Sequence, residues 1–173
     1  MLTTKLKIRL YGDPCLRKKS TLLKEVGPSE RILIDSMIAT MHDYKGIGLA
    51  APQVGVNQRI IVADIGEGPM ALINPKIIRK SGTDILEEGC LSIPGITVKI
   101  KRAQKVLVQY TDHNNKSVEK VFEDLLARVI LHETDHLNGK LIIDYASLTQ
   151  KGKIKKKLKE IGQTLDQKSK TKD

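Results

Sequence analysis

Two histidines and a glutamate form a compact group in the segment His132–His136. The pattern is H-E-x-x-H, and on a helix it places His132 and His136 one turn apart, where both imidazoles can bind one metal ion. Glu133 then lies beside the ion, in position to act as a general base on water. Two partly buried histidines on an ordinary amphipathic helix are the alternative. Acids at the start and Gly139 after the end predict a helix over 124–138, which favours the metal site.

A metal site of this kind needs a third protein ligand. The position six residues after His136 is Ile142, so the metzincin pattern of three histidines is broken. Glu160 follows downstream, but its lysine-rich surroundings favour a surface ion pair. Cys90 lies upstream beside two carboxylates, and a thiolate can bind Zn²⁺ or Fe²⁺ together with two imidazoles. Without the histidines, Cys90 reads as a small buried hydrophobic residue.

Three ordered segments resemble the motifs of the peptide deformylases. They are residues 46–55 (GIGLAAPQVG), 88–92 (EGCLS) and 132–137 (HETDHL), and the similarity extends over roughly residues 5–150. Three motifs in a fixed order are far more specific than H-E-x-x-H alone. Two positions depart from the family pattern. Leu131 stands where glutamine is common. A few residues after the cysteine motif, where many members have an arginine, this chain has Gly95-Ile96-Thr97, and Lys99 is the nearest cation.

The resemblance implies a hydrolase that removes the formyl group from the N-terminal formyl-methionine of nascent polypeptides and releases formate. Cys90, His132 and His136 would hold one divalent ion, Fe²⁺ in the first place, with Zn²⁺, Ni²⁺ or Co²⁺ as other occupants. Glu133 would be the general acid and base. These roles come from the family, carried over onto the matching positions of this sequence.

The same resemblance assigns the substrate contacts. The side-chain amide of Gln53 and the backbone N–H of Leu91 would stabilise the oxyanion, and Gly48 would bind substrate backbone. In another context Gln53 would read as an amide that caps a turn in a Gly/Pro loop. An apolar slot for the methionine side chain is expected from four residues that also suit an ordinary core: Ile47, Leu86, Leu125 and Val129.

The elements that must position these residues form an α+β pattern. A helix is expected after Pro28, with Ser29 as N-cap and a stop at Lys45-Gly46, and strands are expected at 59–64 and 70–74, the second stopped by Pro75. Residues 97–110 are rich in β-branched residues, and 118–122 can pair back across the turn at 112–115 as a hairpin. We therefore expect antiparallel or mixed β-sheets around a central metal-binding helix, with helices near both ends of the chain.

The basic charge is concentrated near the C-terminus. The 173 residues carry a net charge of +10, and residues 150–173 contribute +6 through nine lysines and three acids. We expect one catalytic domain over 1–150, then a basic helix and disordered tail over 151–173, the tail starting near Gln167. Either the helix only packs its apolar stripe on the domain, or it also docks on the ribosome. The stripe comprises Ile154, Leu158, Ile161 and Leu165.

Composition bears on the rival functions and on location. Aromatic residues make up 3%, with no Trp, which argues against a single-strand nucleic-acid platform built on stacking. The alternatives that remain are an HExxH metallopeptidase and a basic RNA-binding module with a structural metal. No signal peptide or membrane-spanning segment is evident, so we expect a cytoplasmic enzyme with no membrane partner and no sequence-specific nucleic acid. Cys15 is expected to be a free, buried thiol.

Overall fold

The computed structural model describes residues 4–170, with side chains described as far as residue 162. It confirms the α+β class. Five strands form one antiparallel sheet in the order β1-β2-β3-β6-β7, and β4 and β5 form a second, two-stranded antiparallel sheet. The helices are α1 (Pro28–Asp43), α2 (Asp124–Leu137) and α3 (Leu148–Lys170). The strands are β1 (Gly48–Ala50), β2 (Ile60–Ala63), β3 (Met70–Ser81), β4 (Asp84–Cys90), β5 (Ile93–Arg102), β6 (Lys105–Thr111) and β7 (Ser117–Glu123).

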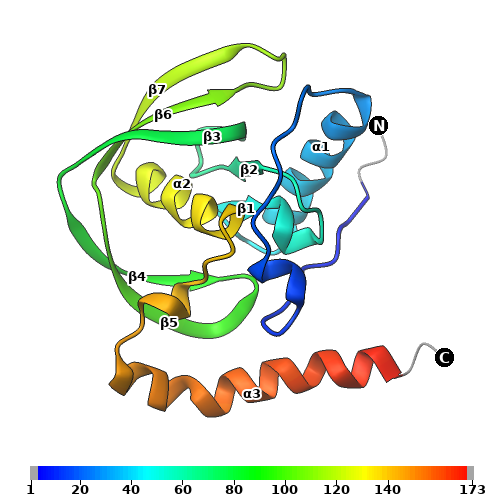
Figure 1. Cartoon of the computed structure of the whole chain (residues 1–173), viewed down its shortest axis with the longest axis vertical. Coiled ribbons are helices and arrows are strands. Elements are labelled where there is room, and N and C mark those ends of the chain that lie inside the picture. The colour runs from blue at the N-terminus through cyan, green and yellow to red at the C-terminus, as the bar shows by residue number, and fades with distance from the viewer. Residues whose placement is uncertain (1–3, 171–173) are drawn as a thin grey trace.

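The helix α2 lies at the centre of the molecule. Figure 1 shows the five-stranded sheet on one side of α2 and the β4–β5 sheet on the other. The helix buries an apolar face that includes Ala127 and Ile130 against Leu72, Val106 and Phe122 of the large sheet. This packing fixes the helix, so that its opposite side presents the two histidines toward β4.

The first helix begins earlier than its sequence suggested. Gly27, and not Ser29, is the N-cap of α1, because Pro28 occupies the first helical position. Proline suits that position, where its missing N–H would have no helical partner. The carboxylate of Glu30 accepts a hydrogen bond of 3.0 Å from the backbone N–H of Gly27. A serine at the N-cap would add a second hydrogen bond through its side chain, which glycine cannot make.

Pro75 does not end β3, the strand expected at 70–74. The strand β3 runs on to Ser81, with a register shift against β6 between Ile73 and Lys76. Asn74 has a φ of 52°, and its side chain exchanges two hydrogen bonds with the backbone of Leu23. The bulge places Pro75 where no ladder N–H is required, so the strand tolerates it.

The β-branched run at 97–110 divides between the two sheets. It contributes β5 to the small sheet and β6 to the large one, with a break at Ala103 and Gln104. The predicted hairpin is confirmed, since β6 and β7 pair directly across the 112–115 turn. The chain thus changes sheets on either side of α2, which creates the space that the functional site occupies.

The C-terminal helix α3 packs along the small sheet, beside β5 (Figure 1). Ile154, Leu158 and Ile161 contact the buried cluster that includes Ile93 and Ile96, as the apolar stripe predicted. The side chain of Leu165 lies outside the described part of the chain, as do residues 171–173. The helix α3 begins at Leu148 and continues to Lys170. The expected domain boundary at residue 150 and the expected disordered tail stay predictions. Among the described helices, none has the length and apolar character needed to span a bilayer.

Candidate metal centre and active site

Cys90, His132 and His136 meet at the end of β4. One ligand atom from each of them lies within 4.8 Å of the other two, and Cys90 Sγ is 3.3 Å from His136 Nε2. Two ligands of one tetrahedral zinc or iron ion, each about 2.0–2.3 Å from it, are separated by distances of this order. The set of one thiolate and two imidazoles therefore fits a divalent transition metal, as the sequence predicted.

The two imidazoles differ in protonation, because burial would lower the pKa of His132 but its hydrogen bonds with Cys90 and Glu88 raise it to about 10. Burial lowers the pKa of His136 well below its ordinary value of 6.5, which keeps the ring in the neutral form that binds metals. His132 contacts Glu88 Oε2 through Nδ1 at 2.9 Å. When Nδ1 donates to the carboxylate, Nε2 is left as the acceptor that faces the ligand group.

Glu88 is itself held by two arginines. Arg102 donates from Nε and Nη2 to the two carboxylate oxygens at 2.6 and 2.9 Å, and Arg128 Nη1 donates to Oε1 at 2.7 Å. Burial alone would raise the pKa of Glu88, but its hydrogen bonds with His132 and Arg102 lower it to about 2. Glu88 therefore stays ionised and orients His132. Arg102 also donates from Nη1 to Asp135 Oδ2 at 2.8 Å, so a second carboxylate holds the arginine in place.

The depressed pKa of Glu88 predicts an acid-dependent stability. The carboxyl group has an ordinary pKa of 4.5 and a folded value of about 2, so its contribution is complete above pH 4.5 and disappears as the pH falls toward 2. The shift corresponds to about 3 kcal/mol of unfolding free energy. Urea unfolding of wild type and Glu88→Gln, both in chelator, should show a stability difference that shrinks across this pH window. Parallel curves for the two proteins would contradict the assignment.

Glu133 faces the same space from α2. It is 4% exposed, and its Oε2 atom has no hydrogen-bond partner within the described structure. Burial raises the pKa of its carboxyl group to about 7. A carboxyl group that titrates near neutral pH and is not committed to another partner suits a general acid and base. Glu133 therefore lines the same cavity as Cys90 and His132, and its role as general acid and base stays a prediction.

Gly48 makes room for the Glu133 side chain. A Cβ atom at Gly48 would lie 2.5 Å from Glu133 Oε1 and 2.7 Å from Val129 Cγ1, closer than real Cβ contacts. The backbone of β1 therefore approaches the face of α2 that carries Val129 and Glu133 only because residue 48 has no side chain. A side chain here would displace Glu133, Val129 or the strand itself.

We expect Gly48→Ala to reduce kcat by about 10²-fold, because a shift of about 1 Å in a catalytic group has an effect of that size. Steady-state kinetics on a formylated peptide measures this. Gly89→Ala is the control, since a Cβ there meets no atom closer than 4.0 Å. Equal activity of Gly48→Ala and wild type would show that Glu133 tolerates the displacement.

Gln53 and Leu91 lie on the other side of the ligand group. Gln53 is 1% exposed, and its Oε1 accepts a hydrogen bond of 2.7 Å from the Ala50 N–H. This bond fixes the amide, so that Nε2 faces Cys90 Sγ at 3.6 Å and Ser92 Oγ at 3.3 Å. Leu91 follows Cys90 directly and lines the same cavity. The donor group of Gln53 therefore points at the Cys90 thiol and the Ser92 hydroxyl.

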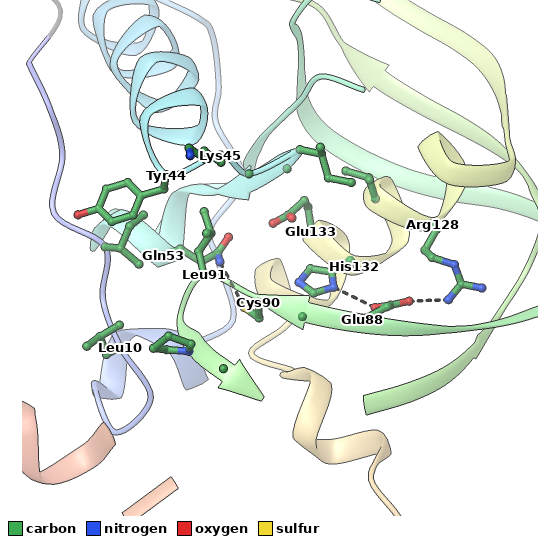
Figure 2. Close-up of a pocket in the computed structure, with 18 of the residues that line it drawn as sticks. Leu10, Tyr44, Lys45, Gln53, Glu88, Cys90, Leu91, Arg128, His132 and Glu133 are labelled. Atoms are coloured by element: carbon green, nitrogen blue, oxygen red, sulfur yellow. Dashed lines mark hydrogen bonds and ion pairs between the residues drawn. The ribbon is translucent and has the colours of Figure 1, made fainter. Parts of the chain in front are cut away.

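A cavity of about 700 Å³ opens onto these groups (Figure 2). Four of the five residues predicted to bind substrate line it, namely Ile47, Gly48, Leu125 and Val129. Leu86 is not among the lining residues. It lies on β4 two residues before Glu88, so it is displaced along the strand by about 6–7 Å, and it is 47% exposed.

Several lining residues were not predicted from the sequence. Arg128 lies in the cavity wall and is buried, and Tyr44 and Lys45 lie at the side of the cavity formed by the end of α1 (Figure 2). The spacing of Arg128, four residues before His132, was the only available signal. Cys15 is free, as expected, but only half-buried, and its thiol donates to the Pro52 carbonyl.

The fold and the site define the class of a metal-dependent hydrolase, with an H-E-x-x-H helix and a cysteine beside its two histidines. The family model described as "Polypeptide deformylase" matches residues 5–152. A peptide deformylase of Thermotoga petrophila is 46% identical over 160 residues, which cover 92% of this chain and 98% of the relative. The chain belongs to the polypeptide deformylase family.

Solved structures agree with this assignment. The peptide deformylase of Legionella pneumophila has a TM-score of 0.87 at 37% identity, and the comparison covers 94% of this chain and 98% of that one. The peptide deformylase of Synechococcus elongatus, solved in complex with actinonin, has a TM-score of 0.84 at 39% identity, covering 91% of each chain. The predicted activity, metal-dependent removal of the formyl group from N-terminal formyl-methionine, is therefore confirmed over the metallopeptidase and the RNA-binding module.

Proposed function

We propose that Cys90, His132 and His136 hold one Fe²⁺ ion and that Glu133 acts as general acid and base when the formyl group leaves the nascent polypeptide. The observation that carries the proposal is the convergence of the three ligand atoms within 4.8 Å beside a buried carboxyl group. A divalent ion held by these three residues would act as a Lewis acid and would make water a nucleophile at neutral pH.

Glu133 would move the proton in both halves of the reaction. Its carboxylate accepts the proton of the attacking water and then delivers it to the nitrogen that leaves as the new N-terminal amine. The raised pKa of Glu133 suits both transfers. The absence of a competing hydrogen bond at Oε2 within the described structure leaves that oxygen available for the transferred proton.

Gln53 Nε2 and the Leu91 N–H would stabilise the charge that develops on the formyl oxygen. Gln53 is preorganised by its bond to Ala50, so its donor pays no reorganisation cost when the charge appears. One such donor is worth about 3–4 kcal/mol of transition-state stabilisation. The Leu91 N–H is adjacent in the chain to the ligand Cys90, which fixes its place beside the ion.

The methionine side chain would occupy the apolar part of the cavity. Leu125 and Val129 lie one turn apart on α2, before His132, and Ile47 faces the cavity from the loop that precedes β1. Gly48 would pair with the substrate backbone, as the family pattern implies. We retain Leu86 as an edge contact, although the cavity does not include it.

The identity of the ion is the part of the proposal that metal analysis tests directly. A site with one thiolate and two imidazoles accepts Fe²⁺, Zn²⁺, Co²⁺ and Ni²⁺, and availability often selects among them. We expect protein purified anaerobically from iron-replete cells to contain iron as its main metal. Elemental analysis by mass spectrometry measures the content, and zinc in excess of iron would contradict the assignment of iron.

We propose the ribosome as a partner that α3 contacts through its lysines. The apolar stripe faces the small sheet, and exposed lysines cover the rest of the described helix. Ribosomal RNA is a polyanion, and formylated chains emerge from the ribosome. Work on nascent chains and a free thiolate ligand both fit the reducing cytoplasm as the place of action.

A C-terminal helix with three fewer lysines should lose ribosome affinity. We expect the triple variant with Lys151, Lys155 and Lys159 replaced by alanine to co-sediment less with ribosomes than wild type at low salt, with unchanged activity on short formylated peptides. The control variant replaces three exposed lysines outside α3, namely Lys80, Lys101 and Lys116. Equal losses in both variants would indicate a non-specific effect of net charge and contradict docking through α3.

A further inference from the structure

Arg128 is a buried arginine for which the hydrolysis itself has no use. It is 6% exposed and lies on α2 one helical turn before His132. A guanidinium group is costly to bury unless its charge is paired and its N–H groups are hydrogen-bonded. The partners of Arg128 therefore indicate what it contributes.

Within the described part of the chain, the guanidinium group of Arg128 donates only to residues of the small sheet. Nη1 donates to Glu88 Oε1 at 2.7 Å and to the Ile100 carbonyl at 3.0 Å. Nη2 donates to the Asp84 carbonyl at 3.0 Å and approaches the Asp84 carboxylate at 3.4 Å. Asp84 and Glu88 are on β4, and Ile100 is on β5. One side chain from the helix that carries both histidines thus binds both strands of the sheet that carries Cys90.

The contacts of Glu88 separate the roles of the two arginines. Its Oε1 accepts hydrogen bonds from Arg102 and Arg128, and its Oε2 contacts Arg102 and His132. These four contacts match the roughly four lone-pair sites of a carboxylate. Arg102 is on β5 and binds Asp135 of α2 as well as Glu88, so it holds the carboxylate within its own sheet and links β5, but not β4 directly, to the helix. Arg128 and His132 link that carboxylate to α2 (Figure 2).

We propose that Arg128 is a positioning residue that sets the register of β4 against α2, and thereby brings Cys90 to the two histidines. It acts at two points of the strand, the first residue Asp84 and the carboxylate Glu88, two residues before Cys90. A strand held at both points cannot slide along the helix without breaking charged hydrogen bonds. The inference rests on the proposed metal site and deepens it.

Cobalt binding tests this role without relying on catalysis. The probe is Co²⁺, with the dissociation constant measured by chelator competition and the ligand geometry by the visible absorption spectrum. We expect Arg128→Gln to weaken Co²⁺ binding by about 10–100-fold, the effect typical of residues that orient metal ligands, and to change the spectrum. Arg128→Lys should recover part of the affinity, because it keeps the charge beside Glu88 and loses the planar fork.

Arg59→Gln is the matched control. Arg59 also ties α2 to the rest of the protein, since its Nη1 donates to the Leu137 carbonyl and to Asn138, but it does not bind Glu88. We expect it to lower the melting temperature and leave the cobalt affinity and spectrum unchanged. Arg128→Gln with wild-type affinity and spectrum would overturn the proposal. If that variant does not fold, the same result for Arg128→Lys would do so. Wild-type protein that binds no Co²⁺ would contradict the metal site itself.

Discussion

Replacing Glu133 with glutamine is expected to lower kcat for a formylated methionyl peptide by about 10²–10⁴-fold, the usual contribution of a general acid and base. Glutamine has nearly the same shape, but it cannot take a proton from water or return one to the leaving amine. The substitution should leave the metal content unchanged, because Glu133 is not part of the group formed by Cys90, His132 and His136. Steady-state kinetics and elemental analysis of the same preparation measure both properties.

Glu87→Gln is the control for this prediction. Glu87 also lines the cavity, but it is exposed on β4 and the reaction assigns it no proton. We expect nearly wild-type kcat for the control. Comparable rates for Glu133→Gln and Glu87→Gln would show that the proton passes through another group, and the account of the mechanism would be wrong.

Replacing Cys90 with serine is expected to remove most of the metal affinity, and with it the activity. A serine hydroxyl is not ionised at neutral pH, so the site would keep two neutral imidazoles and lose its only anionic ligand. Loss of a metal ligand should weaken metal binding by more than the about 10–100-fold that follows loss of a residue that only orients the ligands. Chelator competition followed by metal analysis measures the affinity.

Cys15→Ser is the matched control, because Cys15 is the other free thiol of the chain. Burial, with a further contribution from Asp13, raises the pKa of Cys15 to about 12, so it does not form a thiolate at neutral pH. We expect this variant to bind metal as wild type does. If Cys90→Ser retained its metal as well, the third ligand would have to be another residue.

The chemistry of the site could be predicted from the sequence because its signals are local. His132, Glu133 and His136 are fixed relative to one another by the helical repeat alone. Cys90 and Gln53 are 42 and 79 residues from His132 in the sequence, and only their motifs indicated that they belong to the same site. The structure brings both to the same cavity.

Features that depend on packing between distant segments could not be predicted. Arg128 binds residues 28 to 44 positions away, and no periodicity of α2 distinguishes it from an arginine at the surface. Pro75 was expected to end a strand, but the bulge at Asn74 depends on a contact with Leu23 from another part of the chain. Leu86 was assigned to the pocket by analogy, but it does not line the cavity, because it lies two residues before Glu88 along β4.

Formate release is the measurement that tests the central claim most directly. Full-length protein, loaded anaerobically with Fe²⁺, is incubated with formyl-Met-Ala-Ser, and formate and peptide products are quantified. We predict formate and Met-Ala-Ser in equal amounts, loss of the reaction after treatment with a chelator, and recovery when Fe²⁺ is returned. An intact peptide with every metal tested, or cleavage at an internal peptide bond without formate, would contradict the account.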